Sequence, residues 1–284
     1  MEYTLFKSIF NKQIFENSKV DLLTKIVLNP SRYVGIFRPT KPRAKIIQNL
    51  SQSHEIRFGD AFEKLLELYF QENNYTLLPK KVKDLNNEDL SIDQLFFKDN
   101  DLFFIEQKIR DDHDSTKKVG QINNFDRKIQ VLKNYYPNDN LKGFFYFIDP
   151  DLIKNQNYYV KQLMVLSNKY LNVDLKVSYG KDLFIHLDKV FIWEEIENHL
   201  KKWREELPEF PEINFDLDSN ETFNEIKTIP PNVFKELFEN DLVYNEIVLC
   251  IFPTKETLYL LLDFFKKEKS YKNVALILEN RLKN

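Results

Sequence analysis

The sequence predicts an α/β fold in which a mixed central sheet is flanked by helices. Two short apolar runs, residues 95–97 and 102–105, flank four polar residues and indicate an antiparallel hairpin with a tight turn. Both faces of this hairpin are apolar, and such a sheet is normally covered by helices on both sides. Helix-like and strand-like patterns then alternate along the chain, as is typical of a layered sheet.

The segment before the hairpin predicts a helix. Residues 58, 62, 65, 66 and 69 are apolar and recur at helical spacing. Glu63 lies at the border of this apolar stripe, so we expect it to be half-buried and directed toward the sheet. Glu67 shares the border and competes for the same role, and both acids also fit an ordinary solvated helix face.

The segment after the hairpin continues the alternation. We expect a helix over 122–136, a strand over 143–148, a helix over 159–171 and a strand over 173–179. Residues 183–187 fit one more strand. Further on, Pro231 can begin a helix, since proline fits the first turn, and another helix follows Thr254.

The hairpin brings acidic side chains together. If residues 99–100 form a two-residue turn, Lys98 faces Asp101 and Asp93 falls directly opposite Glu106. Opposed side chains share a face, with Cβ atoms about 4.5 to 5.5 Å apart. Lys108 lies two residues beyond Glu106 and therefore on that face. The two carboxylates repel each other unless a cation lies between them, and oxygen ligands favour Mg²⁺ or Mn²⁺. The alternative is a strand pair in which Lys108 only neutralises a surface acid.

These residues resemble the pattern of the PD-(D/E)xK nuclease superfamily and, within it, the Type II restriction endonucleases. The resemblance covers roughly residues 55–180. Glu63 matches the acid on the family's helix, Asp93 the acid near a central strand, and Glu106 with Lys108 the (D/E)-x-K motif. Ile92 stands where the family name has proline, which makes the motif less specific.

The resemblance implies a restriction-endonuclease-like core and a mechanism. Asp93, Glu106 and the backbone carbonyl of Gln107 would hold Mg²⁺, for which Mn²⁺ can substitute, and Glu63 would complete the ligand set. Lys108 would orient the water that attacks the phosphodiester in line. The implied reaction is sequence-specific cleavage of double-stranded DNA that leaves 5′-phosphate ends. A companion DNA methyltransferase that protects the same site is implied by the class.

Three other functions fit the same residues. A repair or junction-resolving nuclease would use the same site on damaged or branched DNA. A non-catalytic DNA-binding protein on a decayed nuclease fold is disfavoured by the intact acids and lysine. An α/β interaction protein would show no salt-sensitive affinity for DNA.

A polar segment, residues 109–121, follows the expected catalytic strand and lies at the mouth of the site. We expect Arg110, Lys117, Lys118 and Gln121 to contact DNA, and Ser115 or Thr116 to cap the next helix. This segment also suggests a second metal site, although solvated charges are the favoured interpretation. Its residues would be Asp111, Asp112, His113 and Asp114, and His113 is an alternative general base.

Charge is distributed unevenly along the chain. Residues 1–57 carry ten basic and four acidic side chains, whereas residues 194–284 carry twelve basic and nineteen acidic ones. Arg38, Lys41, Arg43 and Lys45 lie in a stretch with two prolines and one glycine, which favours a DNA-contacting loop or arm. The alternative is ordinary solvated charge. The polar residues Asn49, Ser51, Gln52, Ser53 and His54 form a connection into the helix of Glu63 and can face DNA too.

These patterns predict three parts. Residues 1–54 form a basic DNA-contacting region, 55–200 the nuclease core, and 201–284 a mainly helical packing or dimerisation subdomain, which leaves both a monomer and a homodimer open. The 284-residue chain has a net charge of −3 and one cysteine, Cys250, which we expect to be inert. With no membrane span or signal peptide apparent, the chain fits a cytoplasmic bacterial protein.

Overall fold

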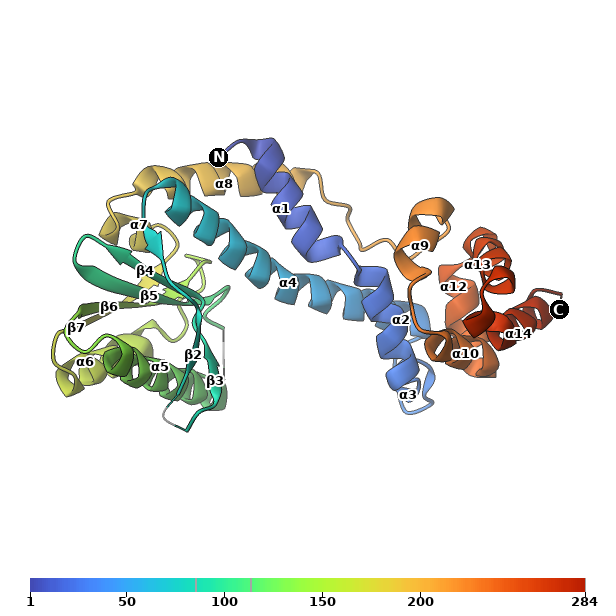
Figure 1. Ribbon diagram of the computed structural model, residues 1–284, viewed down its shortest axis with the longest axis horizontal. Coiled ribbons are helices and arrows are strands. Elements are labelled where there is room, and N and C mark those ends of the chain that lie inside the picture. Colours follow the sequence, from blue (N-terminus) through green and yellow to red (C-terminus); the bar gives the residue numbers. More distant parts are fainter. Residues whose placement is uncertain (85, 113, 284) are drawn as a thin grey trace. The chain divides into compact units, whose positions relative to one another are not determined.

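The computed structural model describes residues 1–84, 86–112 and 114–283, which divide into two compact units. One unit comprises Met1–Phe10 and Gly59–Glu205, and the other comprises Asn11–Phe58 and Glu206–Asn284. The division falls inside the long helix α4 (Pro42–Glu72), which supplies residues to both units (Figure 1). Most of the N-terminal segment, Asn11–Phe58, therefore shares a unit with Glu206–Asn284, although the two were expected as separate parts. The functional roles expected for the three parts stay predictions.

The first unit is built on a five-stranded mixed sheet, as the sequence predicts. Strands β1, β4 and β5 pair antiparallel, whereas β5, β6 and β7 pair parallel. The strands, in sheet order, are β1 (Thr76–Leu77), β4 (Gln94–Lys98), β5 (Asp101–Lys108), β6 (Asn140–Phe147) and β7 (Val173–Tyr179). A separate two-stranded sheet pairs β2 (Lys81–Lys83) with β3 (Asp89–Ser91).

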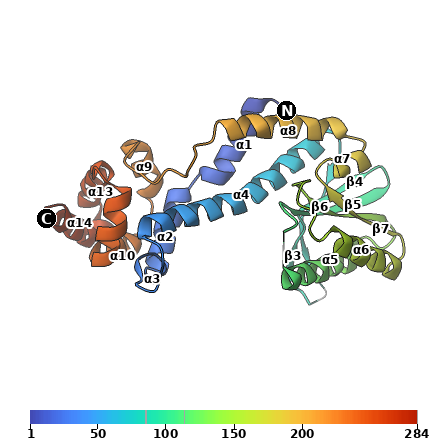
Figure 2. The same cartoon turned by 180° about the vertical axis from the view of Figure 1, so that it is seen from behind.

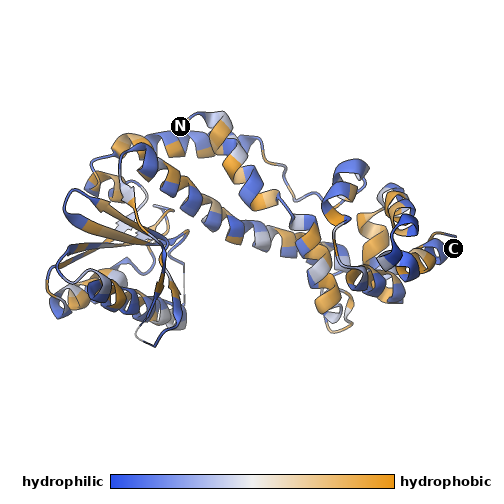
Figure 3. Cartoon of the chain, in the orientation of Figure 1, coloured by the Kyte–Doolittle hydropathy of each residue, from blue (hydrophilic) through white to orange (hydrophobic). Residues whose placement is uncertain are grey.

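Helices cover both faces of the sheet (Figures 1 and 2). On one face, α5 (Ser115–Tyr135) and α6 (Gln156–Lys169) bury aromatic side chains, and the rings of Phe125 and Phe104 lie 4.8 Å apart. On the other face, Phe70 of α4 packs 4.7 Å from Phe96. The short helix α7 (Asp182–His186) and α8 (Val190–Glu205) complete this layer. The apolar strands between the two helical layers explain why this sheet is stable (Figure 3).

The elements expected after the hairpin are confirmed apart from one. Helices α5 and α6 and strands β6 and β7 lie where the sequence places them. The strand expected over residues 183–187 is wrong, because these residues belong to helix α7 and the turn after it. Leu183 and Phe184 are buried there, which explains the apolar pattern.

The regular elements of the second unit are all helical within its described residues. Its core contains Leu23 from α2 (Ser18–Leu28) together with Phe234, Leu261 and Leu278 from the C-terminal helices. The remaining elements are α3 (Ser31–Val34), α9 (Ser219–Ile226), α10 (Pro231–Glu239), α11 (Asp241–Val243), a π-helical turn (Tyr244–Val248), α12 (Leu249–Ile251), α13 (Glu256–Lys267), a 3₁₀ turn (Lys269–Tyr271) and α14 (Lys272–Lys283). The first helix, α1 (Tyr3–Phe15), contributes to both units. No helix in the described part of the chain combines the length and apolarity needed to cross a membrane.

Candidate active site

The β4–β5 hairpin has the register that the sequence predicts. Lys98 pairs with Asp101 and Leu95 with Phe104, around a turn in which Asp99 has a φ of 55°. Asp93 directly precedes β4, and its Oδ2 accepts a hydrogen bond of 2.7 Å from the backbone N–H of Gln107. The hairpin therefore holds the carboxylate of Asp93 beside the peptide bond that joins Glu106 to Gln107.

Lys108 places its ammonium group among three oxygen atoms beside this peptide bond. Its Nζ lies 2.7 Å from Glu106 Oε1, 2.8 Å from the carbonyl oxygen of Gln107 and 3.7 Å from Asp93 Oδ2. Asp93, Glu106, Gln107 and Lys108 are thus brought together, as expected. The three oxygens form a cradle that already accommodates one positive group.

Lys128 is a fifth member of this cluster, and the sequence analysis missed it. It comes from α5, is only 3% exposed and donates a hydrogen bond to Glu106 Oε2. Lys108 and Lys128 therefore occupy one oxygen each of the same carboxylate. Lys128 lies three residues after Phe125 and four before Leu132, both buried, so it is on the inner face of the helix. This spacing is visible in the sequence and could have identified Lys128 as a buried lysine.

The charges in the cluster shift one another's protonation. Burial and the neighbouring Glu106 raise the pKa of Asp93. Burial also acts to raise the pKa of Glu106, but Lys108 and Lys128 outweigh it and lower that pKa. For Lys108, burial acts to lower the pKa, whereas Glu106 and Asp93 raise it above the ordinary value. Lys108 is consequently a charged hydrogen-bond donor at neutral pH.

Glu63 lies next to the hairpin on α4 but is paired elsewhere. Its backbone carbonyl accepts a 2.7 Å hydrogen bond from Gln94 Nε2, which fixes this turn of the helix against β4. Its half-buried carboxylate forms an ion pair with Lys80, which also lies 3.6 Å from Glu67 Oε2. Burial raises the pKa of Glu63 against the effect of Lys80.

Glu63 is nevertheless close enough to the cluster for its charge to act on Lys108 and for the charge of Asp93 to raise the pKa of Glu63. Within the described ranges, no three His, Cys, Asp or Glu side chains are arranged to hold a metal ion. The oxygens suited to a cation at the hairpin are two carboxylates and one backbone carbonyl.

The segment after β5 is organised around Asp111, which is fully buried. Its carboxylate accepts hydrogen bonds of 2.7 and 2.8 Å from Asn155 and of 2.9 Å from the Tyr179 hydroxyl. N–H and O–H donors thus fill the oxygens that a second metal site would need, and the described residues contain no such site. His113 lies outside the described residues.

Asp114 caps helix α5, where Ser115 or Thr116 was expected, and the side chain of Ser115 lies outside the described part of the structure. Its Oδ1 accepts a 2.9 Å hydrogen bond from the backbone N–H of Lys117. The side chain of Lys117 is exposed, whereas Lys118 bonds Asn155 Oδ1 at 3.2 Å and lies over the ring of Tyr158.

The side chain of Gln121, on α5, is directed at Tyr159 of α6. Its Oε1 accepts a 2.6 Å hydrogen bond from the Tyr159 hydroxyl. Arg110, directly before the buried Asp111, is half-exposed. Their expected contacts with DNA stay predictions.

The basic stretch near residue 40 belongs to the second unit. Arg38, Lys41 and Arg43 are exposed, but Lys45 is only 9% exposed and bonds Gln48 Oε1 at 2.7 Å. Residues 35–41 form a loop, as expected, while residues 42–45 begin α4. The polar residues 49–54 are part of the same helix and do not form the separate connection that the sequence suggested.

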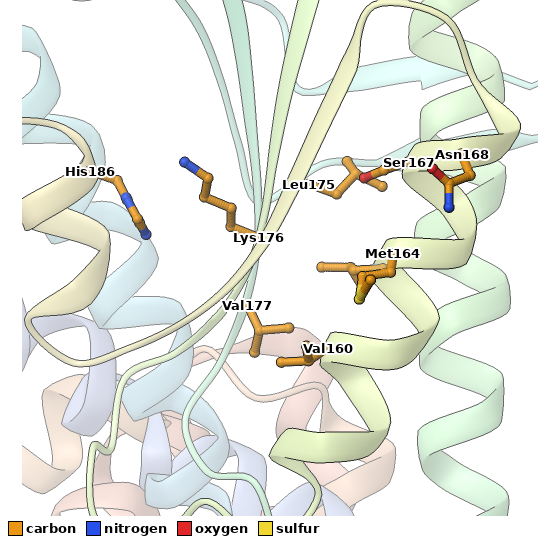
Figure 4. A pocket seen from close by; sticks show the side chains of 9 residues that line it. Val160, Met164, Ser167, Asn168, Leu175, Lys176, Val177 and His186 are labelled. Carbon is orange, nitrogen blue, oxygen red and sulfur yellow. The ribbon is translucent and has the colours of Figure 1, made fainter.

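A surface hollow between α6 and β7 is separate from this cluster (Figure 4). Met164 and Val160 line it from the helix, and Lys176 and Val177 from the edge strand. The other lining residues are Leu163, Ser167, Asn168, Leu175 and His186. None of the expected catalytic residues borders it.

The sheet topology and the paired acids with a lysine at the end of β5 define a nuclease domain of the restriction-endonuclease class. Residues 76–204 match the family model described as Type II restriction endonuclease, HinfI. This part of the chain is a domain of that family, and the protein is a site-specific deoxyribonuclease that acts on double-stranded DNA. No curated protein and no solved structure matches the chain significantly.

The matched segment contains β1 to β7 and α5 to α7, together with nearly all of α8. It therefore includes Asp93, Glu106, Lys108 and Lys128. Glu63 lies before it, so the family match does not extend to the helix that carries this acid.

Proposed function

We propose that this protein cleaves double-stranded DNA at a specific sequence in a Mg²⁺-dependent reaction that leaves 5′-phosphate and 3′-hydroxyl ends. The observation that carries the proposal is the set of three oxygens around Lys108 Nζ, from Glu106, Gln107 and Asp93. They lie at the end of the strand that bears the family's acid and lysine.

The residues present fit a divalent cation. All three atoms are oxygens, two of them from carboxylates, and hard cations such as Mg²⁺ and Mn²⁺ prefer such ligands. Asp93, Glu106 and the Gln107 carbonyl would hold the ion, and Glu63 would contribute directly or through water. When bound, the ion would polarise a phosphoryl oxygen and stabilise the leaving oxyanion.

Lys108 would act as a hydrogen-bond donor and a fixed positive charge. Since Glu106 and Asp93 raise its pKa, the ammonium does not accept a proton from water at neutral pH. It would instead orient the attacking water by hydrogen bonding and offset the charge that grows on the phosphate. Lys128, bonded to Glu106 Oε2, would keep the other oxygen of that carboxylate directed at the cradle.

DNA contact is assigned to two groups of residues. Arg110, Lys117, Lys118 and Gln121 follow in sequence the end of β5, which carries Glu106 and Lys108, so they would hold phosphates beside the cleaved bond. Arg38, Lys41, Arg43 and Lys45 belong to the basic stretch of the second unit. The exposed members of both groups, Lys117, Arg38, Lys41 and Arg43, are best suited to this role.

We further propose a cytoplasmic bacterial protein that works beside a DNA methyltransferase of the same specificity. The methyltransferase would protect host DNA without needing to touch this chain. The helical C-terminal segment would support a homodimer, because a symmetric pair of subunits can cut both strands of a symmetric site.

Cleavage of unmethylated phage DNA in Mg²⁺ tests the proposal. Discrete fragments, whose sequenced ends share one motif and carry 5′-phosphates, are expected from the wild type and from a Lys98→Ala control at the other end of the hairpin. Lys108→Ala is expected to cut nothing while still binding DNA. A smear from wild type, or cutting only of branched DNA, would instead identify a non-specific or a junction-resolving nuclease.

A further inference from the structure

The loop of residues 35–41, between α3 and α4, exposes two neighbouring apolar side chains. Ile36 is 88% exposed and Phe37 is 95% exposed, more than any other large apolar side chain in the described part of the chain. A single exposed apolar residue is common in proteins. Two large ones side by side at the tip of a loop are better explained by a binding partner.

Both ends of this loop are anchored. Tyr33, just before the loop, and Ile46, just after it, are buried in the core of the second unit. The backbone N–H of Gly35 donates a 3.1 Å hydrogen bond to the carbonyl oxygen of Ser31. A Cβ atom at position 35 would lie 2.3 Å from this oxygen, so only glycine fits there. The tip is therefore held close to the helices that carry it.

The surroundings of the tip are strongly positive. Residues 22–54 contain six lysines and arginines and no aspartate or glutamate. Arg32, Arg38, Lys41 and Arg43 are exposed, and none of them forms an ion pair within the described residues. Burial and the neighbouring Arg32 and Arg38 lower the pKa of Lys45, which indicates that these charges gather in one place.

We propose that Ile36 and Phe37 form an apolar wedge that enters a base-pair step of duplex DNA, while Arg38, Lys41 and Arg43 hold the flanking phosphates. Phenylalanine and isoleucine are among the side chains that unstack base steps and kink the duplex, and arginines beside them contact the backbone. This inference rests on the proposed DNA-contacting role of the basic loop.

Charge and size favour duplex DNA over other partners. Four unpaired cations around the tip complement a polyanion, and the same chain carries a nuclease domain that must engage a duplex. Two side chains are too small an apolar area for a stable protein interface, which typically buries about 800 Å² on each partner. A base step, in contrast, accommodates one or two apolar side chains.

The test uses the full-length protein with Ca²⁺ in place of Mg²⁺ and a duplex that contains the mapped cleavage site. 2-Aminopurine is placed in turn at each position of the duplex. Wild type is expected to raise the fluorescence at one step, because that base becomes unstacked. Phe37→Ala should abolish this increase and bind about tenfold more weakly, whereas Phe37→Leu should retain most of it.

Leu171→Ala is the matched control, since this side chain is 87% exposed but lies in the nuclease unit. It should behave as wild type. Because Phe37 packs against little, its removal should leave the thermal unfolding temperature unchanged. Unstacking that persists in Phe37→Ala, or that is absent from wild type, would overturn the wedge.

A charge variant separates the wedge from the DNA-contacting role of the loop. Arg38→Gln combined with Arg43→Gln should reduce the slope of log affinity against log salt by about 2, whereas Phe37→Ala should leave it unchanged. A reduced slope without any effect of Phe37→Ala would refute the wedge alone. An unchanged slope would refute the loop's role in DNA contact. Phe37-dependent binding to vesicles of anionic phospholipid, without unstacking of DNA, would identify a lipid surface instead and overturn the proposal.

Discussion

Lys128, on the sheet-facing side of helix α5, donates a hydrogen bond to Glu106 Oε2, the carboxylate oxygen that Lys108 does not contact. Lys128 is 3% exposed and Glu106 is 5% exposed, so removing Glu106 would leave Lys128 buried without this acid, whereas removing Lys128 would leave Glu106 with Lys108 alone. Removing one partner of such a pair typically costs about 3 to 5 kcal/mol. The pair therefore connects the stability of the core to the geometry of the site.

A double-mutant cycle tests this pairing. Lys128→Met should lower the free energy of unfolding of the wild type by about 3 kcal/mol. When Lys128→Met is made in the Glu106→Gln variant, the loss should be about 1 kcal/mol smaller. Lys117→Met, which changes an exposed side chain of the same helix, serves as the control and should cost under about 0.5 kcal/mol. Urea denaturation provides the measurement. Additive effects of the two changes would show that the residues are not coupled.

Lys108→Met should change metal binding and cleavage in opposite directions. Because the ammonium lies among the three oxygens, a divalent cation has to displace it, and its removal should tighten Mn²⁺ binding about tenfold. The cleavage rate should nevertheless fall about 100-fold or more, since the positive group is missing in the transition state. Calorimetry with Mn²⁺ and single-turnover cleavage measure the two effects. Weaker Mn²⁺ binding would mean that Lys108 supports the cradle and does not occupy it.

Asp93→Asn should stabilise the protein at neutral pH in the presence of a chelator. Burial and Glu106 raise the pKa of Asp93 above its ordinary value of 3.8. A raised pKa means that the ionised form is disfavoured in the folded state, so ionisation costs stability above the folded pKa. Below the ordinary pKa, Asp93 is protonated in both states and this cost vanishes. Denaturation curves should therefore show a gain at pH 7 that is lost near pH 3, and a gain independent of pH would contradict the assignment.

Asp111 should be essential for the segment after β5. In Asp111→Asn an amide NH₂ would face the donors of Asn155 and Tyr179, which should cost about 2 to 4 kcal/mol. Tyr179→Phe removes one hydrogen bond and should cost only about 1 kcal/mol. Thermal unfolding measures both. Similar losses for the two variants would show that Asp111 is not the centre of this network.

The hairpin was predictable because its register depends on local sequence. A two-residue turn and the period of two fix the pairing of Leu95 with Phe104, and the structure has it. The position of Lys128 opposite Glu106 depends on how α5 docks on the sheet, which is a tertiary property. Helix α7 has five residues, too few for a helical period to be distinguished from a strand.

The N-terminal helices show another limit of the sequence. Residues 49–54 look like a polar connection, yet no proline or glycine interrupts residues 43–58, and α4 runs through them. Leu50 and Asn49 are buried there in the second unit. The pairing of Lys80 with Glu63 was equally hidden, because it joins a loop to a helix far apart in sequence.

Titration of Mn²⁺ into Asp93→Asn, Glu106→Gln and wild type tests the cation cradle most directly. We expect each variant to bind Mn²⁺ at least about tenfold more weakly, because each loses one charged oxygen ligand. Asp89→Asn, which alters an exposed acid of the β2–β3 sheet, should bind as wild type does. Unchanged Mn²⁺ affinity in both site variants would contradict the assignment of these oxygens as the metal-binding atoms.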